Sequence, residues 1–263
     1  MSYALITGAS SGIGFELASV FARHKHDLIL VARSADKLNT LKKDLEKAYQ
    51  IDVRVIPIDL SVARSAQILL EAVQAQNLKV DRLVNNAGFG DHGLFADSDI
   101  KKISEMIQVN ITTLTELTRL FLPLMLQNKF GQILNVASTA AFQPGPLMTV
   151  YYATKAYVLF FSEGLFEETE GSGVTVTALC PGPTQSGFQK AAGIRNIPLL
   201  NSLSIPTSAV VAEYGYKAMQ SGQAVAVQGL MNTIFSSTVG LLPRSVARKL
   251  VRKLQEAKIP QAK

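Results

Sequence analysis

Seven short apolar runs, rich in β-branched residues, recur along the 263-residue chain, with longer stretches of helical spacing between them. Unbroken apolar runs are typical of strands buried on both faces, as in parallel sheets covered by helices. The sequence therefore predicts an α/β fold, a three-layer doubly wound parallel sheet (Rossmann-type) with about seven strands, in a single domain over residues 1–263. The predicted strands are 3–7, 27–32, 52–58, 80–86, 131–138, 174–180 and 224–229. The predicted helices are 12–25, 35–49, 61–76, 99–128, 151–171 and 206–221.

Composition and charge narrow the class of protein. Hydrophobic residues make up 48% and charged residues 17%, which is typical of a globular chain and not of a disordered one. Cys180 is the only cysteine and the chain starts without a basic, apolar leader, so we expect no disulfide, no signal peptide and a cytoplasmic location. The net charge of +6 lies entirely in residues 244–263, and a neutral body predicts no nucleic-acid partner.

The stretch TGASSGIG, residues 7–14, follows the first predicted strand and opens the first predicted helix. Gly8, Gly12 and Gly14 allow a tight turn and a close approach of backbone to ligand, and the helix N-terminus offers free N–H groups to a pyrophosphate. The spacing GxxxGxG differs from the GxGxxG fingerprint, and a glycine-rich turn alone can be a simple tight connection. Its place between a strand and a helix indicates a dinucleotide site.

The end of the second predicted strand bears on the choice of cofactor. NAD-binding sheets usually carry Asp or Glu here, to accept from the ribose 2′-hydroxyl. This chain has VARS at 31–34, and Arg33 can form a bidentate pair with a 2′-phosphate while Ser34 adds a hydrogen bond. The alternative is an ordinary surface arginine. We interpret the pattern as a preference for NADP(H).

Two tyrosines and a lysine crowd into VYYATKAYV, residues 150–158. A phenol titrates near pH 10, about three units above neutrality, so it transfers protons poorly unless a nearby cation lowers its pKa. Tyr151 and Lys155 are four residues apart and share a helix face, whereas Tyr152 lies on a neighbouring edge. The alternative is a helix surface with a cation and two half-buried rings.

Seven motifs then occur in order: TGASSGIG, DL at 59–60, NNAG at 85–88, Asn110, Ser138, YxxxK at 151–155 and CPGP at 180–183. Together they resemble the short-chain dehydrogenase/reductase family over nearly the whole chain. The resemblance implies an enzyme that acts on CH–OH and C=O groups. It also implies that Asp59 binds the adenine amino group, that Asn86–Gly88 flanks the adenosine ribose, and that the segment after Pro181 orients the nicotinamide. The expected cofactor-binding residues are Gly8, Ser10, Ser11, Gly12, Ile13, Gly14, Arg33, Ser34, Asp59, Leu60, Asn86, Ala87, Gly88, Tyr151, Lys155, Pro181, Gly182 and Thr184.

The same resemblance implies four catalytic residues. Tyr151 is expected to be the acid/base, and Lys155 to lower its pKa and hold the nicotinamide ribose. Ser138 is expected to bind the substrate carbonyl, and Asn110 to distort its helix and hold a water in a proton relay. Taken alone, Ser138 could be a helix cap, Asn110 a polar surface residue, and Asn85 and Asn86 ties between loops.

We expect an NADP(H)-dependent oxidoreductase that interconverts the carbonyl and alcohol of a hydrophobic substrate. A dedicated 3-oxoacyl or hydroxysteroid reductase is the narrower alternative. An NADP-binding redox sensor without catalysis is the alternative from another class, and the four intact catalytic residues argue against it. The expected apolar pocket consists of Phe89, Phe95, Phe142, Leu147, Met148 and Phe188.

Other features leave alternatives open. The irregular segment 182–205, with Ile194, Leu199 and Leu200, is a candidate substrate lid. In that segment the family often has Thr at the position of Ser186, where a serine hydroxyl, or Thr184 nearby, can make the same bond to the cofactor carboxamide. His92 is interpreted as a loop histidine or, alternatively, a substrate contact, and the sequence offers no cluster for metal ligands.

The remaining partner predictions concern assembly and the basic tail. The resemblance implies a homodimer or homotetramer that pairs through the helices at 110–128 and 151–171. The tail 244–263 predicts an amphipathic helix whose apolar stripe consists of Val246, Leu250 and Leu254, with Ala247 and Val251 beside them. Peripheral membrane contact through its cations is possible, but the stripe lacks Trp and Phe. We therefore favour packing of the stripe on the last strand or on a neighbouring subunit.

Overall fold

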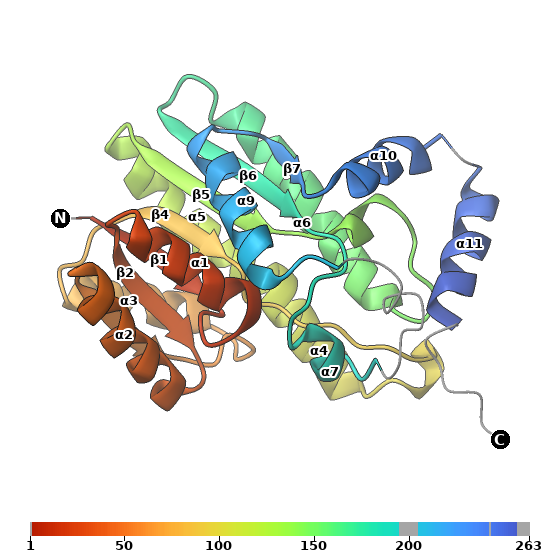
Figure 1. Cartoon of the computed structure of the whole chain (residues 1–263), viewed down its shortest axis with the longest axis horizontal. Coiled ribbons are helices and arrows are strands. Elements are labelled where there is room, and N and C mark those ends of the chain that lie inside the picture. The colour runs from red at the N-terminus through yellow and green to blue at the C-terminus, as the bar shows by residue number, and fades with distance from the viewer. Residues whose placement is uncertain (1, 195–204, 242, 257–263) are drawn as a thin grey trace.

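The computed structural model describes residues 2–194, 205–241 and 243–256 (Figure 1). Its centre is a seven-stranded sheet in the order β3-β2-β1-β4-β5-β6-β7, with every neighbouring pair parallel. The predicted doubly wound α/β fold is confirmed. The strands are β1 (Tyr3–Thr7), β2 (Asp27–Ala32), β3 (Val53–Pro57), β4 (Val80–Asn85), β5 (Gly131–Val136), β6 (Val174–Cys180) and β7 (Val225–Val227).

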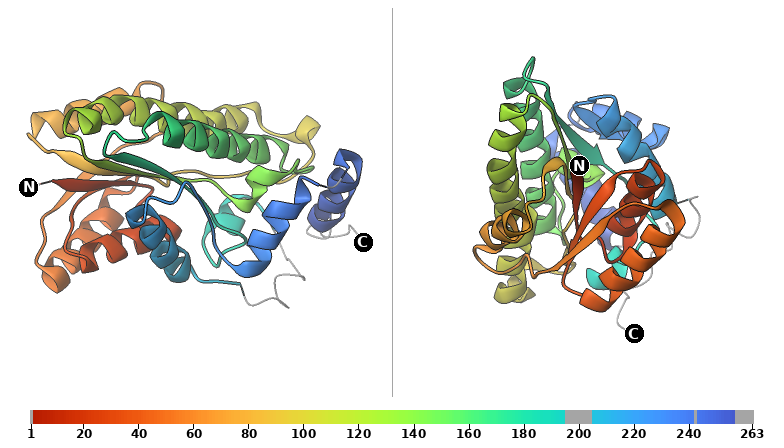
Figure 2. Two further views of the ribbon diagram at one scale, coloured as in Figure 1. Left: turned by 90° about the horizontal axis from the view of Figure 1, so that it is seen from above. Right: turned by 90° about the vertical axis from the view of Figure 1, so that its left-hand side faces the viewer.

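Helices cover both faces of the sheet, as the two side views show (Figure 2). One face carries α1 (Gly12–Arg23), α2 (Ala35–Tyr49) and α9 (Ser208–Gln220). The other carries α3 (Ser65–Ala75), α4 (Ile100–Ile107), the π-helical turn η2 (Gln108–Thr113), α5 (Leu114–Gln127) and α6 (Thr149–Glu168). Parallel strands need such crossover helices, and helices on both faces bury the strands completely.

Alternation along each strand divides the core into two layers. In β1, Ala4 and Ile6 pack with α1, whereas Tyr3 and Leu5 pack with α3 and α5. Successive strand side chains point to opposite faces, so a strand that is apolar throughout supplies both layers. Phe21 fills the first layer and Phe121 the second, and both are fully buried. This double core holds the carboxyl ends of the strands in fixed positions.

The chain order creates a switch point at the centre of the sheet. From β1 the sheet grows outward through β2 and β3, and from β4 it grows the other way through β5, β6 and β7. The connections that leave β1 and β4 therefore run to opposite faces, and a crevice opens between them at the carboxyl edge. Ligands of open α/β sheets bind in such crevices.

The C-terminal segment departs from the sequence prediction. A helix that was not predicted, α10 (Leu230–Val239), follows β7 and leads to α11 (Arg244–Glu256) at the carboxyl edge (Figure 1). The predicted stripe does not pack on β7, because α10 intervenes. The predicted apolar face is instead divided, because Ala247 and Val251 beside the stripe are buried while the stripe itself stays 39–49% exposed. The buried residues of α11 are Ala247, Val251 and Gln255.

None of the helices within the described ranges combines the length and the hydropathy needed to cross a membrane. In the same residues no three or more side chains of His, Cys, Asp or Glu gather in a way that could hold a metal ion. Peripheral membrane contact through the tail stays a prediction.

Candidate active site

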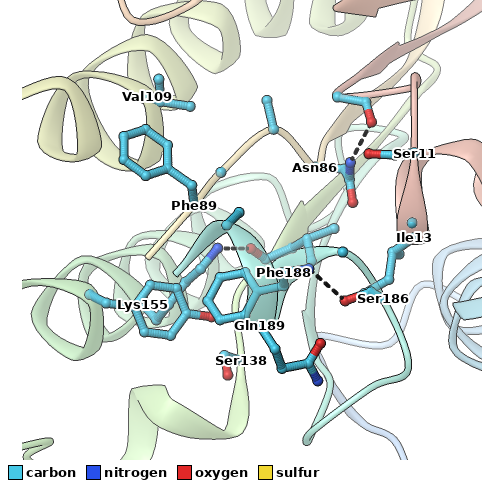
Figure 3. A pocket seen from close by; sticks show the side chains of 18 of the residues that line it. Ser11, Ile13, Asn86, Phe89, Val109, Ser138, Lys155, Ser186, Phe188 and Gln189 are labelled. Atoms are coloured by element: carbon cyan, nitrogen blue, oxygen red, sulfur yellow. Dashed lines mark hydrogen bonds between the residues drawn. The ribbon is translucent and has the colours of Figure 1, made fainter. Parts of the chain in front are cut away.

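A cavity of about 960 Å³ opens at the carboxyl edge, at the switch point between β1 and β4 (Figure 3). It runs from the end of β2, past the glycine-rich turn, to the start of α6. All the predicted site residues line it except Gly14 and Asn110, which lie behind its wall. The predicted residues in the lining are Gly8, Ser10, Ser11, Gly12, Ile13, Arg33, Ser34, Asp59, Leu60, Asn86, Ala87, Gly88, Ser138, Tyr151, Lys155, Pro181, Gly182 and Thr184.

The glycine-rich turn has a backbone that other residues would strain. Gly8 and Gly12 have φ values of +67° and +57°, in the left-handed region that favours glycine. A Cβ on Gly14 would lie 2.4 Å from the Gly8 carbonyl oxygen, so helix and turn pack too closely for any side chain. The Ser11 side chain makes no capping bond to α1, which leaves the first N–H groups of the helix to a ligand. This cradle fits the pyrophosphate of a dinucleotide.

Thr7 joins the two central strands beneath this turn. Its hydroxyl oxygen accepts from the backbone N–H of Asn86 at 2.9 Å and of Ala87 at 3.0 Å. The Asn86 amide donates to the Thr7 carbonyl at 2.9 Å, so Asn86 also ties the two loops together. Thr7 was not predicted as a site residue, although it opens the motif that was. It holds the walls of the crevice at a fixed separation.

Polar and charged groups gather at the end of the cavity next to β2. Arg33 is exposed there with Lys37, a second cation that the sequence prediction missed. Ser34 begins α2 without a capping bond from its hydroxyl. Burial pushes the pKa of Asp59 upward, but hydrogen bonds from Ser61 and the charge of Arg33 outweigh it and lower the pKa. This end can hold a phosphate beside an ionised carboxylate.

The opposite end holds Tyr151, Lys155 and Ser138. Figure 3 labels the side chains of Lys155 and Ser138 there. Tyr151 and Lys155 are both buried and share one face of α6. The Lys155 ammonium donates to the Val136 carbonyl at 2.7 Å and lies 5.8 Å from the centre of the Tyr151 ring. The sequence prediction that these residues meet in one site therefore matches the structure.

The pKa values differ from the expectation. Burial raises the pKa of Tyr151, and a hydrogen bond with Ser138 offsets only part of that rise. Burial also lowers the pKa of Lys155 from its usual 10.5 to about 8. The expectation that Lys155 lowers the pKa of Tyr151 is not met: burial raises that pKa, and the Lys155 ammonium donates to Val136 instead.

Asn110 sits in the π-helical turn η2, so the helix is distorted where the sequence predicted it. Its side-chain oxygen accepts from the Phe89 N–H at 3.2 Å, and its amide donates to the Phe89 carbonyl and to the Thr154 hydroxyl, each at 3.0 Å. Because it is 1% exposed, it is not a polar surface residue. Asn110 and Thr154 together fix the loop after β4 against α6.

Ser138 both caps a short helical turn and lines the cavity. Its hydroxyl oxygen accepts from the Ala140 N–H at 3.1 Å and thereby caps the short turn η3 (Thr139–Phe142). The same residue lines the cavity beside Tyr151. The cap and the site are therefore not alternatives, because the cap sets the direction of the hydroxyl.

The rest of this end is mostly apolar. Phe89, Met148, Phe188 and Ile194 line the cavity, and the Phe188 ring lies 5.1 Å from that of Tyr151. Three of the predicted pocket residues lie elsewhere: Phe95 and Leu147 line a separate cavity of about 20 Å³, and Phe142 packs in the core beneath α6. Within the described residues the lining does not include His92.

The segment after β6 is described only as far as residue 194, so Leu199, Leu200 and the rest of the predicted lid lie outside the described residues. Thr184 is buried, and its hydroxyl donates to the Gly182 carbonyl at 2.9 Å. Ser186 lines the cavity and accepts from the Phe188 N–H at 3.3 Å, at the start of α7 (Phe188–Ala191). Of the two hydroxyls considered for the carboxamide bond, that of Ser186 is therefore the less committed.

The family model described as short chain dehydrogenase matches residues 2–195. The chain belongs to the short-chain dehydrogenase family. Human very-long-chain 3-oxoacyl-CoA reductase is 28% identical over 263 residues, which cover 97% of this chain and 80% of the relative. The zebrafish (Danio rerio) reductase of the same name, form A, is 35% identical over 183 residues, covering 68% of this chain and 57% of the relative.

Solved structures support the same membership. A short-chain dehydrogenase from Sphingobium yanoikuyae in complex with NADPH has a TM-score of 0.83 and 30% identity, and the match covers 100% of this chain and 98% of the other. For this short-chain dehydrogenase the fold and the oxidoreductase class are thus established, with an NAD(P) cofactor. The family model ends at residue 195, so α10 and α11 lie beyond the part that it describes.

The buried ammonium of this short-chain dehydrogenase leads to a prediction about stability. Lys155 binds fewer protons folded, with a pKa of about 8, than unfolded, with a pKa of 10.5. Its contribution to stability therefore rises as pH increases from 8 toward 10.5. We expect the free energy of unfolding of the wild type to rise over this range relative to that of Lys155→Met. Urea unfolding of both proteins from pH 7 to 10 tests this, and a constant difference contradicts it.

Proposed function

We propose that the chain is an NADP(H)-dependent oxidoreductase that interconverts the carbonyl and alcohol of a hydrophobic substrate. The observation that carries the proposal is one continuous cavity with Arg33 at one end and Ser138, Tyr151 and Lys155 at the other. When bound, the nicotinamide of the cofactor donates a hydride to a carbonyl carbon or accepts one from an alcohol.

Tyr151 is the proposed acid/base. Its raised pKa keeps the phenol protonated at neutral pH, which is the form that gives a proton to the oxygen of a carbonyl during reduction. Ser138 donates a hydrogen bond to the same oxygen and stabilises the negative charge that develops there. The Lys155 ammonium favours the phenolate that remains after transfer, since an opposite charge nearby stabilises an anion.

The cofactor half of the cavity supports NADP(H). Arg33, with Lys37 and the Ser34 hydroxyl, would hold the 2′-phosphate, and neither of the two residues directly after β2 is a carboxylate that could accept from a 2′-hydroxyl. Asp59 and Leu60 would hold the adenine, and Asn86–Gly88 the adenosine ribose. The glycine-rich turn from Gly8 to Gly14, including Ser10 and Ile13, would hold the pyrophosphate. Pro181, Gly182 and Thr184 would face the nicotinamide. Asn110 would position the loop after β4 through its hydrogen bonds to Phe89.

The substrate half supports an apolar carbonyl compound. Phe89, Met148 and Phe188 surround the proposed acid/base, and such surfaces favour hydrophobic groups over sugars. A bulky-bulky ketone specific alcohol dehydrogenase from Comamonas testosteroni is 28% identical, with a TM-score of 0.78 over 100% of this chain and 96% of the other. The names of the human and zebrafish relatives favour a second candidate, a 3-oxoacyl thioester.

A panel of carbonyl compounds tests the proposal. Purified protein is incubated with NADPH and, in turn, with bulky ketones, aldehydes, 3-oxoacyl thioesters and 3-oxosteroids, and the loss of NADPH absorbance is followed. We expect turnover of at least one apolar class and none of polyhydroxylated sugars. Tight NADPH binding without turnover of any compound would contradict the proposal and favour a redox sensor.

We also propose that the protein is a homodimer or homotetramer that pairs through α5 and α6. These helices lie side by side on one face of the molecule (Figure 2). Their outer surface exposes Leu124, Tyr157 and Phe160, of which Phe160 is 69% exposed. An aromatic surface of this kind is typical of a homo-oligomer interface.

Light scattering at micromolar concentration tests the assembly. We expect a dimer or tetramer mass for the wild type and a smaller mass for Phe160→Glu, because a charge buried at the interface is unfavourable. Ile68→Glu, at another exposed apolar position on α3, serves as the control and should leave the mass unchanged. A monomer mass for the wild type would refute the proposal.

A further inference from the structure

The C-terminal helix supplies one residue to the cavity. Gln255, in the last turn of α11, lines the substrate end of the cavity. It contacts Tyr152 on α6 there, although the two residues are 103 positions apart in the sequence. It is 4% exposed, whereas the other polar residues of α11 are exposed. Polar side chains are seldom buried to this degree without a hydrogen-bonding function.

One end of the Gln255 carboxamide has a partner and the other does not. Its nitrogen Nε2 donates to the Tyr152 hydroxyl at 2.7 Å, and its oxygen Oε1 is buried with no hydrogen bond. An unpaired buried acceptor is unfavourable because it has lost its contact with water. Tyr152 can satisfy only one end of the carboxamide, and the end that faces it is the nitrogen, so the oxygen is the free end.

This unpaired oxygen distinguishes Gln255 from the rest of the cavity. Two other glutamines of the described chain, Gln143 and Gln228, also have a buried oxygen without a partner, but neither lines the cavity. Among the described residues that line it, Gln255 is the one side chain with such an atom. The unsatisfied acceptor therefore belongs to a side chain that lines the cavity.

Tyr152 fixes the position of this carboxamide relative to the reacting residues. Its ring packs on Gly145 so closely that a Cβ there would lie 2.1 Å from the ring, which leaves the ring little freedom. The ring stands edge-on to that of Tyr151, with 6.2 Å between the centroids. The Gln255 carboxamide is thus held by a residue whose ring contacts the proposed acid/base.

We propose that Gln255, held by Tyr152, is a substrate-binding residue whose free oxygen accepts a hydrogen bond from a hydroxyl or amide N–H of the substrate. The preferred substrate is then an apolar carbonyl compound with a second polar group, a donor, some distance from the reacting carbon. This inference rests on the proposed oxidoreductase function. It assigns substrate selection to α11, which lies beyond the segment matched by the family model.

Matched ketones test this subsite. The probes are methyl ketones with a hydroxyl at the far end of an alkyl chain, in a series of chain lengths, each paired with the ketone that lacks the hydroxyl. For wild type we expect a higher kcat/KM for the hydroxylated member at one chain length. Gln255→Leu should reduce that value roughly tenfold, mainly through KM, and leave the plain ketone within about twofold, because the plain ketone has no donor for the carboxamide to bind. Lys249→Ala, at an exposed position on the same helix, should alter kcat/KM for neither ketone.

The outcomes separate this inference from the function on which it rests. Equal kcat/KM values for both ketones of every pair would overturn the subsite, and so would equal losses of kcat/KM for both ketones in Gln255→Leu. In either case, turnover of the plain ketone would still support the oxidoreductase function. If no ketone is turned over, Kd values of each pair are measured by calorimetry on the NADPH-loaded protein. Equal Kd values in wild type would then overturn the subsite as well, and a preference that Gln255→Leu abolishes would support it.

Discussion

Replacing Tyr151 by Phe is expected to lower kcat for carbonyl reduction roughly a hundredfold to ten-thousandfold, the range typical of a lost general acid. The change removes one hydroxyl and keeps the ring, its contact with Phe188 and its place 5.8 Å from the Lys155 ammonium. Binding of NADPH should therefore stay within about twofold, so the loss falls on the chemical step. Single-turnover rates and NADPH titration of the same preparation measure the two quantities.

The adjacent tyrosine provides a matched control. Tyr152→Phe also removes one buried hydroxyl from the same turn of α6, but this hydroxyl binds Gln255 and not the proposed reaction centre. For a plain ketone we expect a change in kcat of less than about threefold, since no proton passes through Tyr152. If Tyr152→Phe is the more damaging change, the two tyrosines have been assigned to the wrong roles.

The fold could be predicted from the sequence because its signals are local and repeated. Runs such as DLILVA at 27–32 and VTVTALC at 174–180 are apolar on both faces, and each became a buried strand with the predicted bounds. The least accurate strand is the last one, where only Val225–Val227 pairs with β6. An edge strand has one neighbour, so its length depends on that neighbour and not on its own residues.

Much of the site could also be predicted, because strand ends of a doubly wound sheet meet at one edge. What the sequence missed are residues whose role comes from a partner far along the chain. Thr7 acts through Asn86, Thr154 through Asn110, and Gln255 through Tyr152, a partner 103 residues away. A single threonine or glutamine carries no local signal of such contacts.

The direction in which the Tyr151 pKa shifts could not be predicted from the sequence spacing of Tyr151 and Lys155 either. Four residues on a helix bring Lys155 near Tyr151, and spacing alone suggests that the cation lowers the phenol pKa. The structure buries both groups, and this burial raises the pKa of Tyr151 and lowers that of Lys155. Burial depends on what α7 and the loop after β4 place over the pair, which is a property of the fold.

Arg33→Ala is expected to weaken NADPH binding by about 1.5–3 kcal/mol, roughly tenfold to a hundredfold in Kd, because a charge-assisted pair with the 2′-phosphate is lost. The Kd for NADH should change little, since NADH has a hydroxyl where NADPH has the phosphate. Arg33 is exposed at the mouth of the cavity and has no hydrogen bond to another described residue that its loss would break. The substitution should therefore leave the fold and the melting temperature unchanged. Fluorescence titration with both cofactors at fixed ionic strength gives the two Kd values.

Two further variants identify which charge the cofactor recognises. Lys37→Ala removes the neighbouring cation and should weaken NADPH less than Arg33→Ala, because an ammonium cannot make the bidentate pair of a guanidinium. Lys101→Ala removes an exposed cation on α4 that lines the same cavity, and it should change neither Kd. A wild type that prefers NADH would refute the assignment of NADP(H). Equal losses for both cofactors in Arg33→Ala would show that this arginine contributes general attraction to the cofactor and does not read the 2′-phosphate.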